Sequence, residues 1–135
     1  MDAIIFDDDV TVLYVTATSF PAGIMQAFAQ LREKVQGMEG RKLFGLSRPE
    51  NGMITYHAAT EEKFESEGKQ LHCDTLVLKK GKYICHTVNN FMNNLPAIGN
   101  TFRELLAQPG IDPQGYCVEW YFNDTDVHCM VRLAE

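Results

Sequence analysis

An internal repeat is the feature of this chain that most limits how it can fold. Residues of matching type recur 71 positions apart: Phe20 with Phe91, Ile24 with Leu95, Leu31 with Phe102, and Arg32-Glu33 with Arg103-Glu104. After the long loop at 109–114 the offset becomes 75, so that Gly40 matches Gly115 and Leu43 matches Val118. A repeated unit predicts two halves of similar fold. At this offset Phe44 matches Glu119, which is the main chemical departure from the repeat.

Each half contains segments in the order β-α-β-β. The elements expected in the first half are a strand at 10–20, a helix that begins near Pro21 and ends near 37–40, and strands at 41–47 and 53–60. Those expected in the second half are a strand at 75–88, a helix at 94–108, and strands at 116–122 and 127–133. β-branched and aromatic residues favour the strands, and apolar residues at steps of three and four favour the helices. Phe28 and Phe102 lie on the apolar faces of the two predicted helices and are therefore expected in the core. The segment 48–52, which contains Asn51-Gly52, predicts a hairpin turn.

Length and composition indicate one globular domain over residues 1–135. A chain of 135 residues with 45% hydrophobic and 22% charged residues has the size and usage of an ordinary packed domain. The half-repeats are expected at about 1–62 and 70–135. The charged segment 61–69 lacks an apolar period and is predicted to be an exposed link between them.

Charge, hydropathy and cysteine spacing limit which partners and which cellular location are expected. A net charge of −6 repels phosphate backbones, so no direct nucleic-acid partner is expected. No apolar run approaches the ~20 residues of a membrane-spanning helix, and no basic and apolar leader opens the chain, which predicts a cytoplasmic protein without a membrane anchor. The four cysteines, Cys73, Cys85, Cys117 and Cys129, occur singly and are expected to be reduced.

Three adjacent pairs of histidine and cysteine raise the question of a metal site. They are His72-Cys73, Cys85-His86 and His128-Cys129. Neighbouring residues on a strand point to opposite faces, so the two members of a pair do not readily bind one ion. No metal and no cofactor is therefore expected.

Glu119 lies in the predicted strand 116–122, where side chains alternate between two faces. Cys117, Glu119 and Tyr121 share one face, while Val118 and Trp120 point the other way. A carboxylate buried among such neighbours needs a cation or a donor, and burial raises its pKa. One interpretation is a site for a positively charged ligand between aromatic rings. The other is a solvent-facing carboxylate that pairs with Arg132 or Arg41.

Four segments, in this order and spacing, resemble the GyrI-like effector-binding family. They are Phe-Pro-Ala-Gly at 20–23, Gly-Arg-Lys-Leu-Phe-Gly-Leu-Ser-Arg-Pro at 40–49, Lys-Gly-Lys-Tyr at 80–83 and Cys-Val-Glu-Trp-Tyr at 117–121. The resemblance covers nearly the whole chain and implies a stand-alone effector-binding domain. It implies an α+β fold in which two pseudo-symmetric β-α-β-β repeats form a curved antiparallel sheet with two helices on one face. No helix-turn-helix segment is expected, so the domain should not bind DNA itself.

The resemblance also implies a function. In that family the acidic residue that Glu119 matches lies in an aromatic furrow and meets hydrophobic, cationic ligands. The residues expected to line the furrow here are Glu119, Tyr121, Trp120, Phe44, Tyr56 and Tyr83. A first alternative is a hydrolase of strained genotoxic molecules, with Glu119 as general base and Tyr121 or Tyr56 as second donor. A second is an acidic module that binds a protein partner, as gyrase-inhibitory members do, and a homodimer is left open.

Overall fold

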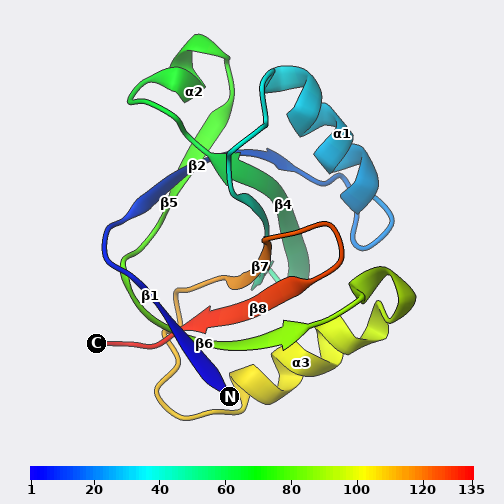
Figure 1. The fold of residues 1–135 in the computed structure, drawn as a ribbon, viewed down its shortest axis with the longest axis vertical. Helices are drawn as coiled ribbons and strands as arrows, with labels where there is room; N and C mark the ends of the chain where they lie inside the picture. Colours follow the sequence, from blue (N-terminus) through cyan, green and yellow to red (C-terminus); the bar gives the residue numbers. More distant parts are fainter.

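The computed structural model describes residues 1–135 as one antiparallel sheet with two long helices on one of its faces (Figure 1). The strands are β1 (Asp2–Phe6), β2 (Val10–Thr16), β3 (Leu43–Glu50), β4 (Met53–Glu61), β5 (Asp74–Leu78), β6 (Gly81–Val88), β7 (Cys117–Tyr121) and β8 (Val127–Arg132). The helices are α1 (Ile24–Lys34), α2 (Glu67–Gln70) and α3 (Pro96–Leu106), with the short 3-10 turn η1 (Phe91–Asn93) before α3. The predicted order β-α-β-β occurs twice, as β2-α1-β3-β4 and β6-α3-β7-β8.

The strand order is symmetric about the centre of the sheet. It runs β1-β6-β8-β7-β3-β4-β2-β5, so β7 and β3 meet in the middle and equivalent strands lie at equal distances from them. Helix α1 packs on β2 and β4, and α3 packs on the equivalent strands β6 and β8. The predicted fold class, two pseudo-symmetric units that share a curved antiparallel sheet, is confirmed.

Individual side chains keep the repeat as well. Thr16 Oγ1 lies 2.9 Å from His57 Nδ1, and Thr87 Oγ1 lies 2.8 Å from His128 Nδ1. Both members of the second pair stand 71 positions after those of the first. The offset found in the sequence is therefore also the offset of a structural contact.

Three apolar cores hold the sheet and helices together. The face of the sheet away from the helices curls around its own core, which includes Phe44, Leu46, Tyr83, Val118 and Met130. Each long helix closes a smaller core against the opposite face. These two cores are built around Leu13, Ala27, Leu31 and Val35 under α1 and around Phe102, Leu105, Val127 and Val131 under α3. Most, but not all, residues on the predicted apolar faces of the two helices thus pack in these cores.

The segment 75–88, predicted as one strand, is two. It divides at Lys79-Lys80 because its parts have different neighbours: β5 pairs with β2, and β6 pairs with β8 and β1. The equivalent strands β1 and β5 therefore each pair with the other half of the molecule. The hairpin turn is also shorter than predicted, since β3 continues through Glu50 and only Asn51-Gly52 turns, with φ values of 53° and 79°.

The charged segment 61–69 is only in part the exposed link that its composition predicted, since residues 63–66 and 69 are exposed. It contains α2, and Glu67 is buried. Arg41 donates to both carboxylate oxygens of Glu67 at 2.7 Å, and the amide of Lys63 donates to Oε1 at 2.8 Å. The prediction was wrong for Glu67, because the partner that permits its burial lies 26 positions earlier in the chain.

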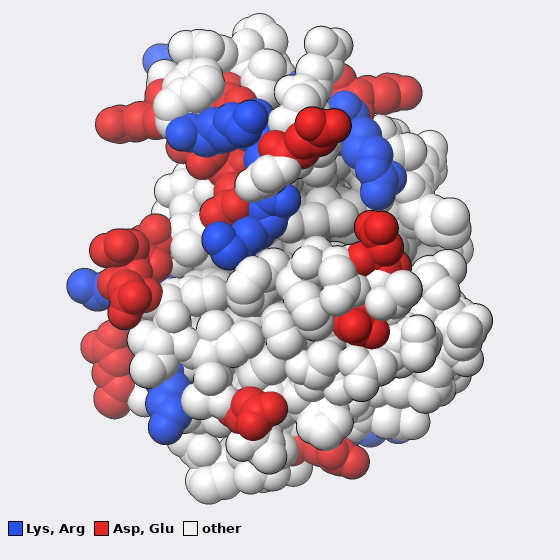
Figure 2. All heavy atoms as spheres, viewed as in Figure 1, with Lys and Arg blue, Asp and Glu red and all other residues white.

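The charged side chains are unevenly distributed over the surface. Figure 2 shows many of these charged side chains over the upper part and along the left edge of this face, whereas its centre and lower right are largely uncharged, with a few isolated acidic side chains. None of the helices is both long and apolar enough to pass through a membrane.

Candidate functional site

Glu119 lies at the middle of the sheet, on the face that carries the helices. Its strand β7 is flanked by β3 and β8, and Glu119 is opposite Gly45 on one side and Cys129 on the other. The side chain is buried, with the residue 8% exposed. A carboxylate in such a position needs polar partners, because desolvation of the charge is costly.

Two tyrosine hydroxyls supply those partners. Tyr56 Oη, from β4, donates to Glu119 Oε1 at 3.1 Å, and Tyr121 Oη donates to the same oxygen. No hydrogen bond from the chain reaches Oε2, and every fully buried polar side-chain atom of the chain has a partner. It follows that Oε2 keeps some contact with solvent.

No arginine neutralises Glu119. Arg41 pairs with Glu67, and Arg132 pairs with Asp112 and Glu135 at 3.0 and 2.9 Å. The interpretation of Glu119 as a solvent-facing carboxylate paired with Arg41 or Arg132 is therefore wrong.

Gly45 makes room for this arrangement. A Cβ atom at Gly45 would overlap the Tyr56 hydroxyl oxygen, and it would lie 2.8 Å from Tyr56 Cζ and 2.9 Å from Glu119 Oε1. Only a residue without a side chain lets the Tyr56 hydroxyl cross β3 to reach the carboxylate.

Three phenylalanines surround the two tyrosines. Phe28 of α1 meets both, with ring centroids 6.2 Å from Tyr56 and 6.0 Å from Tyr121 in edge-to-face geometry. Phe20 stacks on Tyr56 at 5.9 Å, and Phe91 of η1 lies 5.3 Å from Tyr121. The two tyrosines that bind Glu119 thus belong to a cluster of five aromatic rings that come from both halves of the chain.

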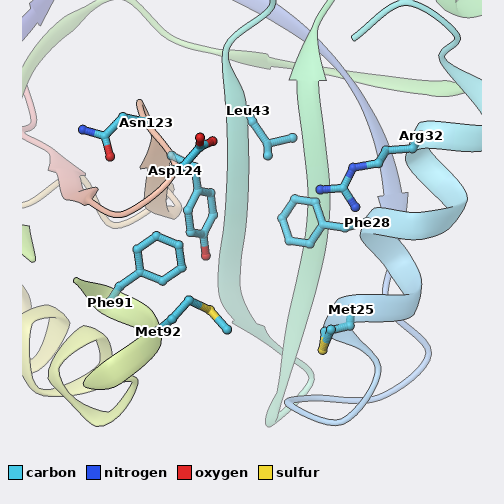
Figure 3. A pocket seen from close by; sticks show the side chains of 9 residues that line it. Met25, Phe28, Arg32, Leu43, Phe91, Met92, Asn123 and Asp124 are labelled. Atoms are coloured by element: carbon cyan, nitrogen blue, oxygen red, sulfur yellow. The ribbon is translucent and has the colours of Figure 1, made fainter. Parts of the chain in front are cut away.

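A groove of about 310 Å³ opens beside this cluster. Helix α1 forms one wall, and η1 with the loop between β7 and β8 forms the other (Figure 3). The lining residues are Met25, Phe28, Arg32, Leu43, Phe91, Met92, Tyr121, Asn123 and Asp124. Since Tyr121 lines the groove and also binds Glu119, the carboxylate lies one side chain behind the groove surface.

The electrostatics of the cluster follow from burial. Desolvation raises the pKa of Glu119, and the two tyrosine hydrogen bonds oppose that rise. Burial, followed by the negative charge of Glu119, raises the pKa of both Tyr56 and Tyr121. The tyrosines therefore remain donors, and the chain provides no cation for the carboxylate.

No protein-family model matches the chain, and no curated protein matches it. Solved structures do. An integron cassette protein from Vibrio cholerae superposes with a TM-score of 0.69 at 14% identity, covering 98% of this chain and 94% of that one. SAV2435 bound to tetraphenylphosphonium gives 0.61 at 14% identity over 97% and 93%, and a hydrolase from Listeria innocua gives 0.58 at 8% identity over 98% and 90%. These likenesses establish the fold.

The structure brings together three of the six residues that the sequence placed in the furrow, Glu119, Tyr121 and Tyr56. It does not bring Trp120, Phe44 and Tyr83 to them. Phe44 and Tyr83 are buried in the core on the opposite face, and Trp120 packs against that core. Alternation along each strand is the cause: Phe44 and Trp120 are adjacent in register and both point away from the helices.

Four residues of the cluster were not assigned to it from the sequence. Phe28 was expected in the core, and Phe20, Phe91 and Gly45 were given no role. The repeat could have pointed to Phe20 and Phe91, because these two residues match each other in it. In the structure they contact Tyr56 and Tyr121 respectively. A glycine between Phe44 and Leu46 within a strand was a further sign that another group comes close to the backbone there.

Proposed function

We propose that this protein binds hydrophobic small molecules that carry a positive charge, in the groove beside Glu119. The observation that carries the proposal is a buried carboxylate with two neutral donors, aromatic surroundings and no cation from the chain. A ligand cation would supply the charge that Glu119 lacks. SAV2435, which shares the fold, is bound to tetraphenylphosphonium, a cation of this kind.

The distribution of hydrogen bonds favours a ligand over a closed structural pair. Both tyrosines donate to Oε1, which leaves Oε2 without a hydrogen-bond partner from the chain and so available to a ligand cation. The ring faces of the surrounding aromatic residues would add cation–π attraction of about 0.5–2 kcal/mol. The net charge of −6 also favours the approach of cations over anions.

The groove suits a small ligand rather than a macromolecule. Its volume of about 310 Å³ falls at the lower end of the usual range for ligand pockets. Met25 and Met92 stand at its rim and are 83% and 66% exposed. Methionine is unbranched and flexible, so this rim can adapt to ligands of different shape.

Calorimetric titration with tetraphenylphosphonium tests the proposal. The wild type should bind, and Glu119→Gln should raise the Kd about 10-fold or more, since it removes one charge from a desolvated site. Glu104→Gln, on the exposed face of α3, makes the same change in net charge away from the groove and should leave the Kd unchanged. Equal affinity in wild type and Glu119→Gln, or no binding by the wild type, would overturn the proposal.

Hydrolysis in the same groove is a second candidate. It is favoured by the raised pKa of Glu119, which suits a general base, and by the fold shared with a hydrolase. In this scheme Glu119 takes a proton from water while the oxygen attacks an electrophilic carbon of a strained ring, and Tyr56 or Tyr121 donates to the leaving atom. Incorporation of heavy oxygen from labelled water into a ring-opened product, lost in Glu119→Gln, would support this candidate over simple binding.

A further inference from the structure

Arg32 is the one basic residue that lines the groove. Met25, Phe28 and Arg32 lie at steps of three and four on α1, so they share the face of the helix that forms the groove wall. Figure 3 shows the Arg32 guanidinium extending over the groove near Leu43, with Met25 at the other end of the same wall.

The Arg32 guanidinium has no partner in the chain. Neither a hydrogen bond nor an ion pair joins it to another side chain or to the backbone, whereas its repeat equivalent Arg103 donates to Asn100 Oδ1 at 2.8 Å. The two buried arginines, Arg41 and Arg132, are both paired with carboxylates. Arg32 therefore places an unpaired positive charge at a groove that we propose to bind cations.

The strand register relates Leu43, near which Arg32 extends, to Glu119. Leu43 is opposite Tyr121, and Gly45 is opposite Glu119, so the two positions lie two residues apart along β3. The groove thus has Arg32 at its end near Leu43, and the Glu119 carboxylate lies behind Tyr121, which lines the groove.

We infer that the ligand is amphoteric, with a flat apolar body, a cationic group held by Glu119, and a carboxylate that pairs with Arg32. A ligand with only positive charge would be attracted by Glu119 and repelled by Arg32, whereas one that also carries a negative charge satisfies both. This inference rests on the proposed function and narrows its ligand class.

Asp124 is the other charged residue at the groove. It is exposed, lies across the groove from Arg32, and forms no ion pair with it. Its charge opposes a ligand carboxylate, so Asp124→Asn should strengthen the binding of an amphoteric ligand.

Two dyes of nearly the same shape make the test. Rhodamine B carries a cationic ring system and a carboxylate, and its ethyl ester carries the cation alone. By fluorescence polarisation, Arg32→Gln should weaken the binding of rhodamine B about 3- to 10-fold and leave or improve that of the ester. The control variant Arg103→Gln, which changes the equivalent arginine of α3, should alter neither.

Each outcome separates this inference from the function on which it rests. An equal loss of affinity for both dyes in Arg32→Gln would mean that Arg32 shapes the groove without binding an anion, and would overturn the inference. Unchanged binding of rhodamine B would overturn it too, while the proposed function would stand. If the wild type binds neither dye nor tetraphenylphosphonium, the proposed function fails and the inference fails with it.

Discussion

Replacing Gly45 with alanine should damage both stability and the site. The added Cβ would overlap the Tyr56 hydroxyl and approach Glu119 Oε1, so Tyr56 must move and give up its hydrogen bond to the carboxylate. Overpacking a closed site costs about 1–3 kcal/mol, and losing a hydrogen bond to a charged group costs about 1.5–3 kcal/mol. We expect a total loss of about 3–5 kcal/mol in the free energy of unfolding.

Thermal denaturation followed by circular dichroism measures this loss. For a chain of this size each kcal/mol lowers the Tm by about 3 °C, so Gly45→Ala should melt about 9–15 °C below the wild type. Gly99→Ala is the matched control, because Gly99 lies in α3 with open space where its Cβ would be. That substitution should stabilise by about 0.5–1 kcal/mol.

A double variant tests whether the Tyr56 hydroxyl causes the loss of stability in Gly45→Ala. In a Tyr56→Phe background the hydroxyl is absent, so Gly45→Ala should cost less there than in the wild type. If Gly45→Ala matches the wild type in Tm, or costs the same with and without the Tyr56 hydroxyl, the close packing of Gly45, Tyr56 and Glu119 is refuted.

Two further predictions concern the buried carboxylates. Glu67→Gln leaves Arg41 buried without a counter-charge and should destabilise by about 3–5 kcal/mol in urea unfolding, whereas the exposed Glu65→Gln should change stability by less than about 0.5 kcal/mol. Because folding raises the pKa of Glu119, the folded state binds its proton more tightly than the unfolded state, so stability should fall as the pH rises from about 4.3 toward neutrality. Over that pH range the wild type should therefore lose stability relative to Glu119→Gln. A difference in unfolding free energy that does not change with pH would contradict the burial of Glu119.

The β-α-β-β order of the two halves could be predicted from the sequence because it depends on local patterns. Steps of three and four mark both helices, and the Asn51-Gly52 pair marks the hairpin. Strand partners depend on distant segments, so the exchange of β1 and β5 between halves left no local signal. The burial of Glu67 depends on Arg41 in the same way.

The site was predictable only in part for a similar reason. Glu119 and Tyr121 share a face by alternation alone, but which face meets the helices depends on the whole sheet. Alternation alone therefore did not distinguish Phe44 and Trp120 from Tyr56, and both lie on the face opposite Glu119. Phe28 belongs to the helix stripe, yet it packs at the edge of the core, against the two tyrosines of the site.

The central claim is that the groove selects positive charge through Glu119. The most direct measurement compares tetraphenylphosphonium with tetraphenylborate, which has nearly the same size and shape and the opposite charge, by calorimetric titration of the wild type and Glu119→Gln. The account predicts that the wild type binds the cation at least about 10-fold more tightly than the anion, and that the variant loses most of this preference. Equal affinities for the two ions in the wild type, or a preference that survives in Glu119→Gln, would contradict it.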